Sequence, residues 1–163
     1  MNIFGLHPKP RKCARYHVNR HVVKMILEYA QQLSTCWHVI DPEHKLFCPT
    51  MKPTHKNHPC SKWVRESTGN YKWLCELALE LCKEYTYRYN RVHKTEAVIS
   101  VLALNIPPLP SDTMTRLPLA MPDEFKTDSV VKSYRLYYKH GKKHIHAWKN
   151  RDTPKFIGDS ESE

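Results

Sequence analysis

The stretch that decides the fold runs from His17 to Cys36 and reads HVNRHVVKMILEYAQQLSTC. Its apolar side chains recur at spacings of three and four residues: Val18, Val22, Met25, Ile26, Tyr29 and Leu33. This spacing places them in one stripe along an amphipathic helix, because an α-helix turns once every 3.6 residues. The stretch therefore predicts a long helix that packs against a helical core.

The opposite face of this helix carries a second ordered series of side chains. These are the polar row His17, His21, Lys24, Glu28, Gln31 and Thr35. One interpretation is a solvated face with an ordinary Lys24–Glu28 pair at i, i+4. Solvated faces usually carry interchangeable Glu and Lys, however, whereas this row mixes histidine, lysine, glutamate and glutamine. The mixture favours a helix that lines a charged cleft.

The rest of the chain predicts further helices separated by long loops. Periodicity and capping signals place them at residues 60–67 after Pro59, at 70–89 with Asn70 as the N-cap, at 95–104, and from Asp128 or Ser129 onward. Five prolines between residues 105 and 123 predict an extended loop. We expect a mainly α fold, a single compact domain of about four helices with long Pro-rich loops over residues 1–157, and a disordered acidic tail over 158–163.

Length and composition limit the class of protein. The 163 residues suffice for one domain, and 40% hydrophobic residues indicate a globular chain. No apolar run is long enough to span a membrane, and Pro8 and Pro10 interrupt the region where a signal peptide would need apolar residues. The six cysteines lack C-x-x-C spacing, so we expect reduced thiols in a cytosol.

The charge of the chain predicts a polyanionic partner. Lys and Arg number 26 against 16 Asp and Glu, a formal net charge of +10. Two segments without acids carry much of this excess, with six basic residues over 1–24 and five over 139–151. If they converge in the fold they would form one surface for nucleic acid, RNA or DNA, because lysines and arginines on phosphates release counterions. The alternative is a charged surface that only maintains solubility.

Two shorter segments add candidate binding residues. Pro59 suits the first turn of a short helix whose free N–H groups could meet a phosphate, and His55, Lys56 and Asn57 lie just before it. A zinc site built from Cys48, His55, His58 and Cys60 is the competing idea, disfavoured because structural zinc sites show two close ligand pairs. The helix end over 84–91 interleaves aromatic and basic residues, which fits either base stacking or a snorkelling helix end.

Several strings together resemble a known family. They are Met1-Asn2-Ile3-Phe4, Lys12-Cys13-Ala14, residues 21–28, 54–63, 84–89 and 120–124, and they are similar to small proteins of tailed bacteriophages. More remotely, the order of features resembles the pyrimidine-dimer DNA glycosylases of the phage endonuclease V type. The resemblance implies that Glu28 matches the catalytic glutamate, His58-Pro59 the turn, and Glu84 with Arg88 the end of the following helix. It also implies a location in the cytoplasm of an infected bacterium.

In that family the chain's own N-terminal amine attacks the sugar, and arginines flank the glutamate. Here Asn2 follows Met1, and Leu27 and Gln31 stand beside Glu28. We therefore expect a non-catalytic nucleic-acid-binding protein on an endonuclease V-like fold. The alternative is a DNA glycosylase and abasic lyase that acts through the amine of Met1 and through Glu28.

The candidate interface follows from these patterns. We expect His17, His21, Lys24 and Gln31 to line one cleft with Glu28 and with His55, Lys56 and Asn57. The nucleic-acid-binding set is His17, Arg20, His21, Lys24, Gln31, His55, Lys56, Asn57, His58, Arg65, Arg88, Lys142 and Lys143. We expect no cofactor, no metal and no membrane partner, and the sequence does not predict the oligomeric state.

Overall fold

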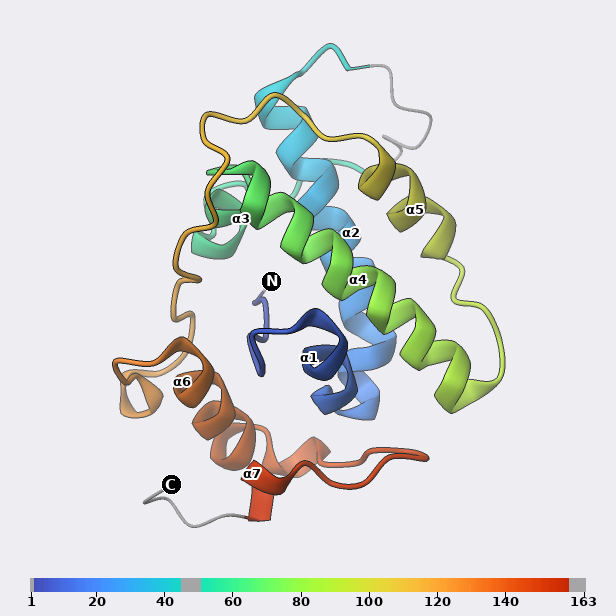
Figure 1. Cartoon of the computed structure of the whole chain (residues 1–163), viewed down its shortest axis with the longest axis vertical. Helices are drawn as coiled ribbons and strands as arrows, with labels where there is room; N and C mark the ends of the chain where they lie inside the picture. Colours follow the sequence, from blue (N-terminus) through green and yellow to red (C-terminus); the bar gives the residue numbers. More distant parts are fainter. Residues whose placement is uncertain (1, 45–50, 159–163) are drawn as a thin grey trace.

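A computed structural model of the chain describes residues 2–44 and 51–158. It contains the helices α1 (Pro10–Tyr16), α2 (Asn19–Ile40), α3 (Pro59–Val64), α4 (Thr68–Tyr89), α5 (Glu96–Leu104), α6 (Val130–Leu136) and α7 (Lys155–Gly158) (Figure 1). Two short 3-10 turns, η1 (Asp123–Phe125) and η3 (Lys143–Ile145), and one π-helical turn, η2 (Tyr137–Gly141), complete them. These described residues form no β-strand, which confirms the mainly α class.

The central helix α2 forms as its apolar stripe predicts. The stripe residues Val18, Val22, Met25, Ile26, Tyr29 and Leu33 are all buried. The helix continues beyond Cys36 to Ile40 because Trp37 and Ile40 extend the same apolar spacing from Leu33. The stripe packs against α4, which crosses α2 at the centre of the molecule (Figure 1).

Helix α4 begins earlier than the sequence predicts. Ser67 is its N-cap, since the Ser67 hydroxyl accepts a hydrogen bond from the N–H of Asn70 at 3.0 Å. The prediction of Asn70 as the cap was wrong because its side-chain amide binds elsewhere, donating to the carbonyl of Trp63 at 2.7 Å and accepting from the N–H of Thr115 at 2.8 Å. These bonds fasten the Pro-rich loop to α4. Helix α3 ends at Val64, before the predicted end at Ser67, because Ser67 is the N-cap of α4.

The helices near the two ends of the chain show mixed agreement with the predictions. Ser129 caps α6, as one of the two expected residues, and α5 covers most of the predicted range. The sequence did not predict the short helices α1 and α7. Gly158, assigned to the tail, is the last residue of α7. The rest of the tail lies outside the described residues.

The segment from Ile3 to Leu6 lies in the interior without regular secondary structure (Figure 1). Ile3 and Leu6 are 0% exposed and Phe4 is 4% exposed. Segments without secondary structure normally run over the surface, where water satisfies their backbone groups. This one is instead surrounded by helices, and its neighbours form the candidate site.

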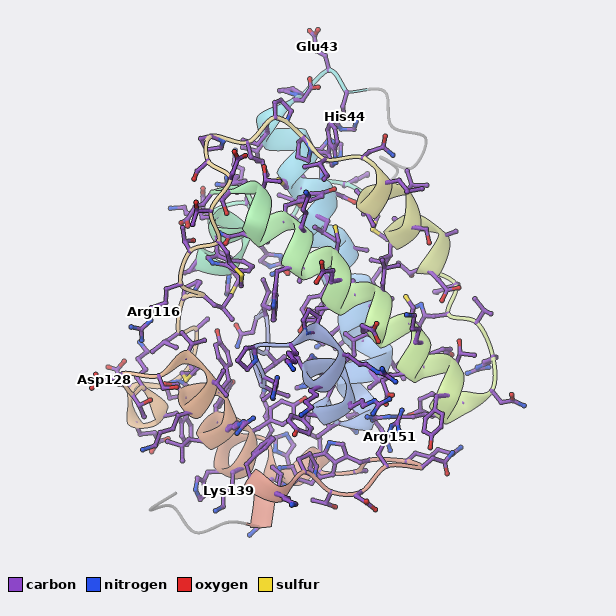
Figure 2. The ribbon with its side chains drawn as sticks, in the orientation of Figure 1. Glu43, His44, Arg116, Asp128, Lys139 and Arg151 are labelled. Carbon is purple, nitrogen blue, oxygen red and sulfur yellow. The ribbon has the colours of Figure 1, made fainter. Side chains whose placement is uncertain are left out.

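The C-terminal region returns to the start of α2. The N–H of Asn19 donates to the carbonyl of Ala147 at 2.8 Å, and the indole of Trp148 donates to the carbonyl of Tyr16 at 2.9 Å. Figure 2 shows Arg151 reaching the end of α4. The two basic segments therefore converge at one end of the molecule.

Candidate functional site

The N-terminal segment is held by hydrogen bonds to three different parts of the fold. The amide of Asn2 donates to the carbonyl of Ala120 at 2.7 Å. The N–H of Phe4 donates to the hydroxyl of Tyr29 at 3.2 Å, and the thiol of Cys13 donates to the carbonyl of Phe4 at 3.1 Å. The side chain of Asn2 is thus held by the Pro-rich loop, and the backbone of Phe4 by α2 and α1. Met1, the residue whose amine the sequence singles out, lies outside the described residues.

His17, just before α2, and His21, within α2, form a buried hydrogen-bond network next to this segment. His17 Nδ1 lies 2.7 Å from the carbonyl oxygen of Cys13, and His17 Nε2 lies 3.0 Å from the hydroxyl of Tyr29. A carbonyl can only accept, so Nδ1 carries the proton and Nε2 accepts from Tyr29. His21 Nδ1 lies 2.6 Å from the hydroxyl of Tyr138, and its ring stacks on Phe4 with centroids 4.3 Å apart. The network fixes the ring and backbone of Phe4.

Burial keeps both histidines neutral. It lowers the pKa of His17 to about 4 and the pKa of His21 to about 2, and for His21 the nearby positive charges of Lys142 and Lys24 add to the effect of burial. His17 is fully buried and His21 is 7% exposed. The expectation that His17 contacts nucleic acid was wrong, because its side chain is enclosed and both ring nitrogens bind protein groups. His21 serves to position Phe4.

The middle of the polar row reaches the surface. Lys24 is exposed, and Glu28 and Gln31 are half-buried. At its far end Thr35 is buried and bonds the backbone of Thr54, whose N–H donates to the Thr35 hydroxyl at 3.1 Å. This contact places the segment 54–57 at the end of the row.

The segment that follows Thr54 is exposed at three positions and caps a helix at the fourth. His55, Lys56 and Asn57 are exposed. His58 accepts a hydrogen bond at Nδ1 from the N–H of Cys60, at 3.1 Å, and so caps α3. Burial is the largest cause that lowers the pKa of His58. His58 is therefore a neutral cap, whose Nδ1 is used by the backbone of α3.

The cluster at the end of α4 is structural. Arg88 is 2% exposed and donates to the Glu84 carboxylate at 2.9 Å and to the carbonyls of His17 and Arg15 at 2.8 and 3.0 Å. Arg151 donates to the other oxygen of Glu84 at 2.6 Å, and its guanidinium lies 3.9 Å from the ring centroid of Tyr87. The expectation that Arg88 binds nucleic acid was wrong, since its donors are used to tie α4 to the start of α2.

The exposed cations come from both ends of the chain. Arg20, Lys24 and Lys143 are exposed, and Lys142 is half-buried with its ammonium 5.9 Å from the ring centroid of Phe4. Lys24 and Lys142 both lower the pKa of His21, so both act on the same ring. The structure therefore brings Lys24 and Lys142 together on the face of the molecule that carries His21. Sequence patterns could not reveal this pairing, because Lys142 is far from Lys24 along the chain.

Arg65 lies apart from that face. It is half-buried at the end of α3, and its charge lowers the pKa of Cys36, which burial raises to about 12 overall. Among residues 2–44 and 51–158, no group of three or more His, Cys, Asp and Glu side chains is arranged to hold a metal ion. Cys48, named in the zinc alternative, lies outside that range.

The length and apolar character of a helix determine whether it can cross a membrane. Within the part of the chain that the structure covers, no helix combines the length and the apolar character that crossing a membrane requires.

Comparison with known proteins identifies the family. A search of curated proteins and a search of solved structures each gave no significant match. The sequence profile described as pyrimidine dimer DNA glycosylase matches residues 1–97, which is more than half of the chain. The match includes α1 to α4, and with them the buried N-terminal segment and the polar row. The chain belongs to the pyrimidine dimer DNA glycosylase family.

Proposed function

We propose that this protein is a DNA glycosylase with abasic-site lyase activity, in which the chain's N-terminal amine is the nucleophile and Glu28 the assisting carboxylate. The observation that carries the proposal is the buried course of residues 3–6 beside α2, held by hydrogen bonds at Asn2 and Phe4. A segment that served only to begin the chain would not need its backbone fixed by the Pro-rich loop, α1 and α2. A nucleophile does need such fixing, because misplacement by an ångström lowers the rate of reaction steeply.

The chemistry needs an amine and a carboxylate. The neutral amine attacks C1′ of the damaged nucleotide through its lone pair, and the base leaves with the electron pair of the broken glycosidic bond and takes up a proton. The attached nitrogen then loses two protons as the C1′–O4′ bond of the sugar ring opens, and O4′ takes up one proton, which leaves an imine between protein and sugar. An α-amino group suits this step because its ordinary pKa of about 7.7–8.0 leaves a neutral fraction at cellular pH.

The place of Glu28 on α2 supports the second role. It is half-buried in the polar row, one helical turn from Lys24, on the helix that also holds Phe4 through Tyr29 and His21. A carboxylate there would stabilise the positive charge that develops on the sugar. It would also accept and return protons as the imine forms and collapses.

The exposed cations suit the DNA backbone. The exposed Arg20, Lys24 and Lys143 and the half-buried Lys142 come from the two basic segments that meet at the start of α2. Membership of a DNA glycosylase family supports DNA rather than RNA as the partner. Phosphate contacts of this kind position a protein on DNA without reading sequence.

A second candidate function is DNA binding without catalysis. Leu27, beside Glu28, is 37% exposed, and Gln31 stands one turn further on. An aliphatic side chain and an amide thus stand where arginines accompany the family's glutamate. This observation favours binding over turnover.

Replacement of Glu28 by glutamine tests the proposal. Activity is measured as strand cleavage of duplex DNA containing one thymine dimer or one abasic site, and binding by anisotropy of the same duplexes. We expect Glu28→Gln to bind normally and to cleave about 100- to 10,000-fold more slowly. Glu43→Gln is the matched control, because Glu43 is exposed beyond the far end of α2 (Figure 2). Wild-type binding without cleavage would support the second candidate instead, and unchanged cleavage by Glu28→Gln would remove Glu28 from the mechanism.

A further inference from the structure

A polar hollow of about 310 Å³ lies between α1 and the second half of α4. Its walls carry arginines from α1, a tyrosine and charged side chains from α4, and Arg151 from the C-terminal region. Both α1 and α2 pack against α4, and Figure 1 shows α1 and α4 in front of α2. Because the polar row faces away from the stripe that packs on α4, the hollow lies on a different face from Glu28. The proposed reaction does not use it.

Two arginines on α1 bring unpaired positive charge to the hollow. Arg11 and Arg15 both line it, and their spacing of four residues places them one above the other on the same side of α1. Arg15 accepts a hydrogen bond from Arg88 at its backbone carbonyl, which leaves its side chain unused. Within the described chain, neither guanidinium pairs with a carboxylate. Both therefore remain available as donors to a ligand.

The two carboxylates that line the hollow are already paired. The side chain of Glu84 is 5% exposed and is held by Arg88 at 2.9 Å and by Arg151 at 2.6 Å. Glu80 lies 3.2 Å from the ammonium of Lys83. Four cations and two carboxylates line the hollow, which leaves it with a net charge of +2. A ligand of matching charge is a dianion.

Arg151 and Tyr87 form a fixed edge of the hollow. Arg151 donates to Glu84 from Nε and Nη2, and its guanidinium lies 3.9 Å from the ring centroid of Tyr87. The Tyr87 hydroxyl donates to the carbonyl of Asn150 at 2.9 Å, which holds the ring in place. Among the described residues, Nη1 of Arg151 has no hydrogen-bond partner and can donate to a ligand. Tyr87 is 51% exposed, so its ring offers an apolar wall beside these donors.

We infer that this hollow binds a phosphate monoester, with its phosphate between Arg11, Arg15 and Arg151 and the group that carries the phosphate against Tyr87. A monoester has a charge of about −1.5 to −2 at pH 7, which matches the hollow, whereas a backbone diester has a single charge. Arginine forks bind phosphate oxygens through paired N–H groups. The volume lies at the lower end of the roughly 300–1,000 Å³ of small-molecule sites, which leaves room for part of the carrier. Membership of the family does not assign this site, since Arg151 lies outside the matched residues.

Calorimetric titrations with two pairs of probes test the inference. The first pair is thymidine 5′-monophosphate and thymidine, and the second is a single-stranded oligonucleotide with and without a 5′-phosphate. We expect the monophosphate to bind and thymidine not to bind. A preference for the phosphorylated oligonucleotide over its 5′-hydroxyl form would identify a strand end as the source of the monoester, and equal binding of the two would identify a free small molecule. Absence of discrimination in both pairs would overturn the inference.

A double variant, Arg11→Gln with Arg15→Gln, tests the assigned donors. It should weaken binding of the monophosphate about 100-fold, because each charge-assisted hydrogen bond contributes a factor of about 10 or more. Arg11→Gln alone should weaken it about 10-fold. The matched control is Lys9→Gln with Lys12→Gln, which removes the same charge from exposed side chains at the same helix that do not line the hollow. This control should bind as the wild type does.

Thermal unfolding of both double variants checks that they are folded, and we expect no change in Tm because the substituted side chains form no ion pair within the described chain. An equal loss of binding in the two double variants would overturn the inference, since it would reflect overall charge alone. The site is independent of the proposed function, so Glu28→Gln should bind every probe as the wild type does. Cleavage of damaged DNA by a protein that binds no monoester would refute this site and leave the proposed function standing.

Discussion

Replacement of Glu84 by glutamine should destabilise the protein strongly. The Glu84 carboxylate binds Arg88 at 2.9 Å and Arg151 at 2.6 Å, and the side chains of Glu84 and Arg88 are 5% and 0% exposed. The glutamine side chain keeps the size of glutamate but leaves the buried Arg88 guanidinium without a counter-charge. Removing one partner of a buried ion pair costs about 3–5 kcal/mol in the free energy of unfolding. For a chain of this length that corresponds to a fall in Tm of roughly 6–20 °C.

Urea denaturation followed by circular dichroism measures this change. Glu80→Gln is the matched control, because Glu80 lies one turn earlier on α4 and pairs at 3.2 Å with Lys83, whose side chain is 74% exposed. An exposed pair of this kind contributes about 0–1 kcal/mol. If Glu84→Gln and Glu80→Gln lower the free energy of unfolding by the same amount, Glu84 does not tie the C-terminal region to α4 and α2.

Two further predictions concern pH and salt. The folded-state pKa of His17 is about 4 against an ordinary 6.5, so the unfolded chain binds more protons below pH 6.5 and the free energy of unfolding should fall by about 1.5 kcal/mol for this group between pH 6.5 and 5. A His17→Gln variant that keeps the full pH dependence in urea titrations would contradict this assignment. Replacing Lys142 and Lys143 by alanine should reduce the slope of log K for DNA against log salt by about 0.9 for each phosphate that the protein no longer neutralises. An unchanged slope, with Lys83→Ala as control, would assign the two lysines to solubility.

The helices could be predicted because their signals are local. The apolar spacing of α2 and the serine cap of α6 depend on residues within a few positions of one another. The prediction of Asn70 as the N-cap of α4 was wrong for two reasons. Ser67 takes that role instead. The side chain of Asn70 binds Thr115, which lies too far away in the sequence to appear in a local pattern. Helices α1 and α7 are short, and we attribute their formation to packing against other segments, which a local pattern does not show.

The site could be predicted only in outline. The polar row shows which side chains share a face, but not which end of that face is enclosed. His17 and His21 are enclosed because Phe4 and Tyr138, from opposite ends of the chain, pack onto them. The sequence predicts Arg88 as a nucleic-acid-binding residue because nothing near it in sequence shows that Arg151 joins its ion pair with Glu84. The sequence also gives no sign that Tyr137, far from Phe4 along the chain, lies beside it.

Borohydride trapping of the protein on abasic DNA tests the central claim most directly. An imine between the chain's amine and the sugar would be reduced to a stable adduct, and mass spectrometry of the digested complex would locate it. We predict an adduct on the N-terminal peptide that acetylation of the N-terminus abolishes and that Lys24→Ala leaves in place. An adduct on lysine side chains alone, or DNA binding with no adduct at all, would contradict catalysis through the N-terminal amine.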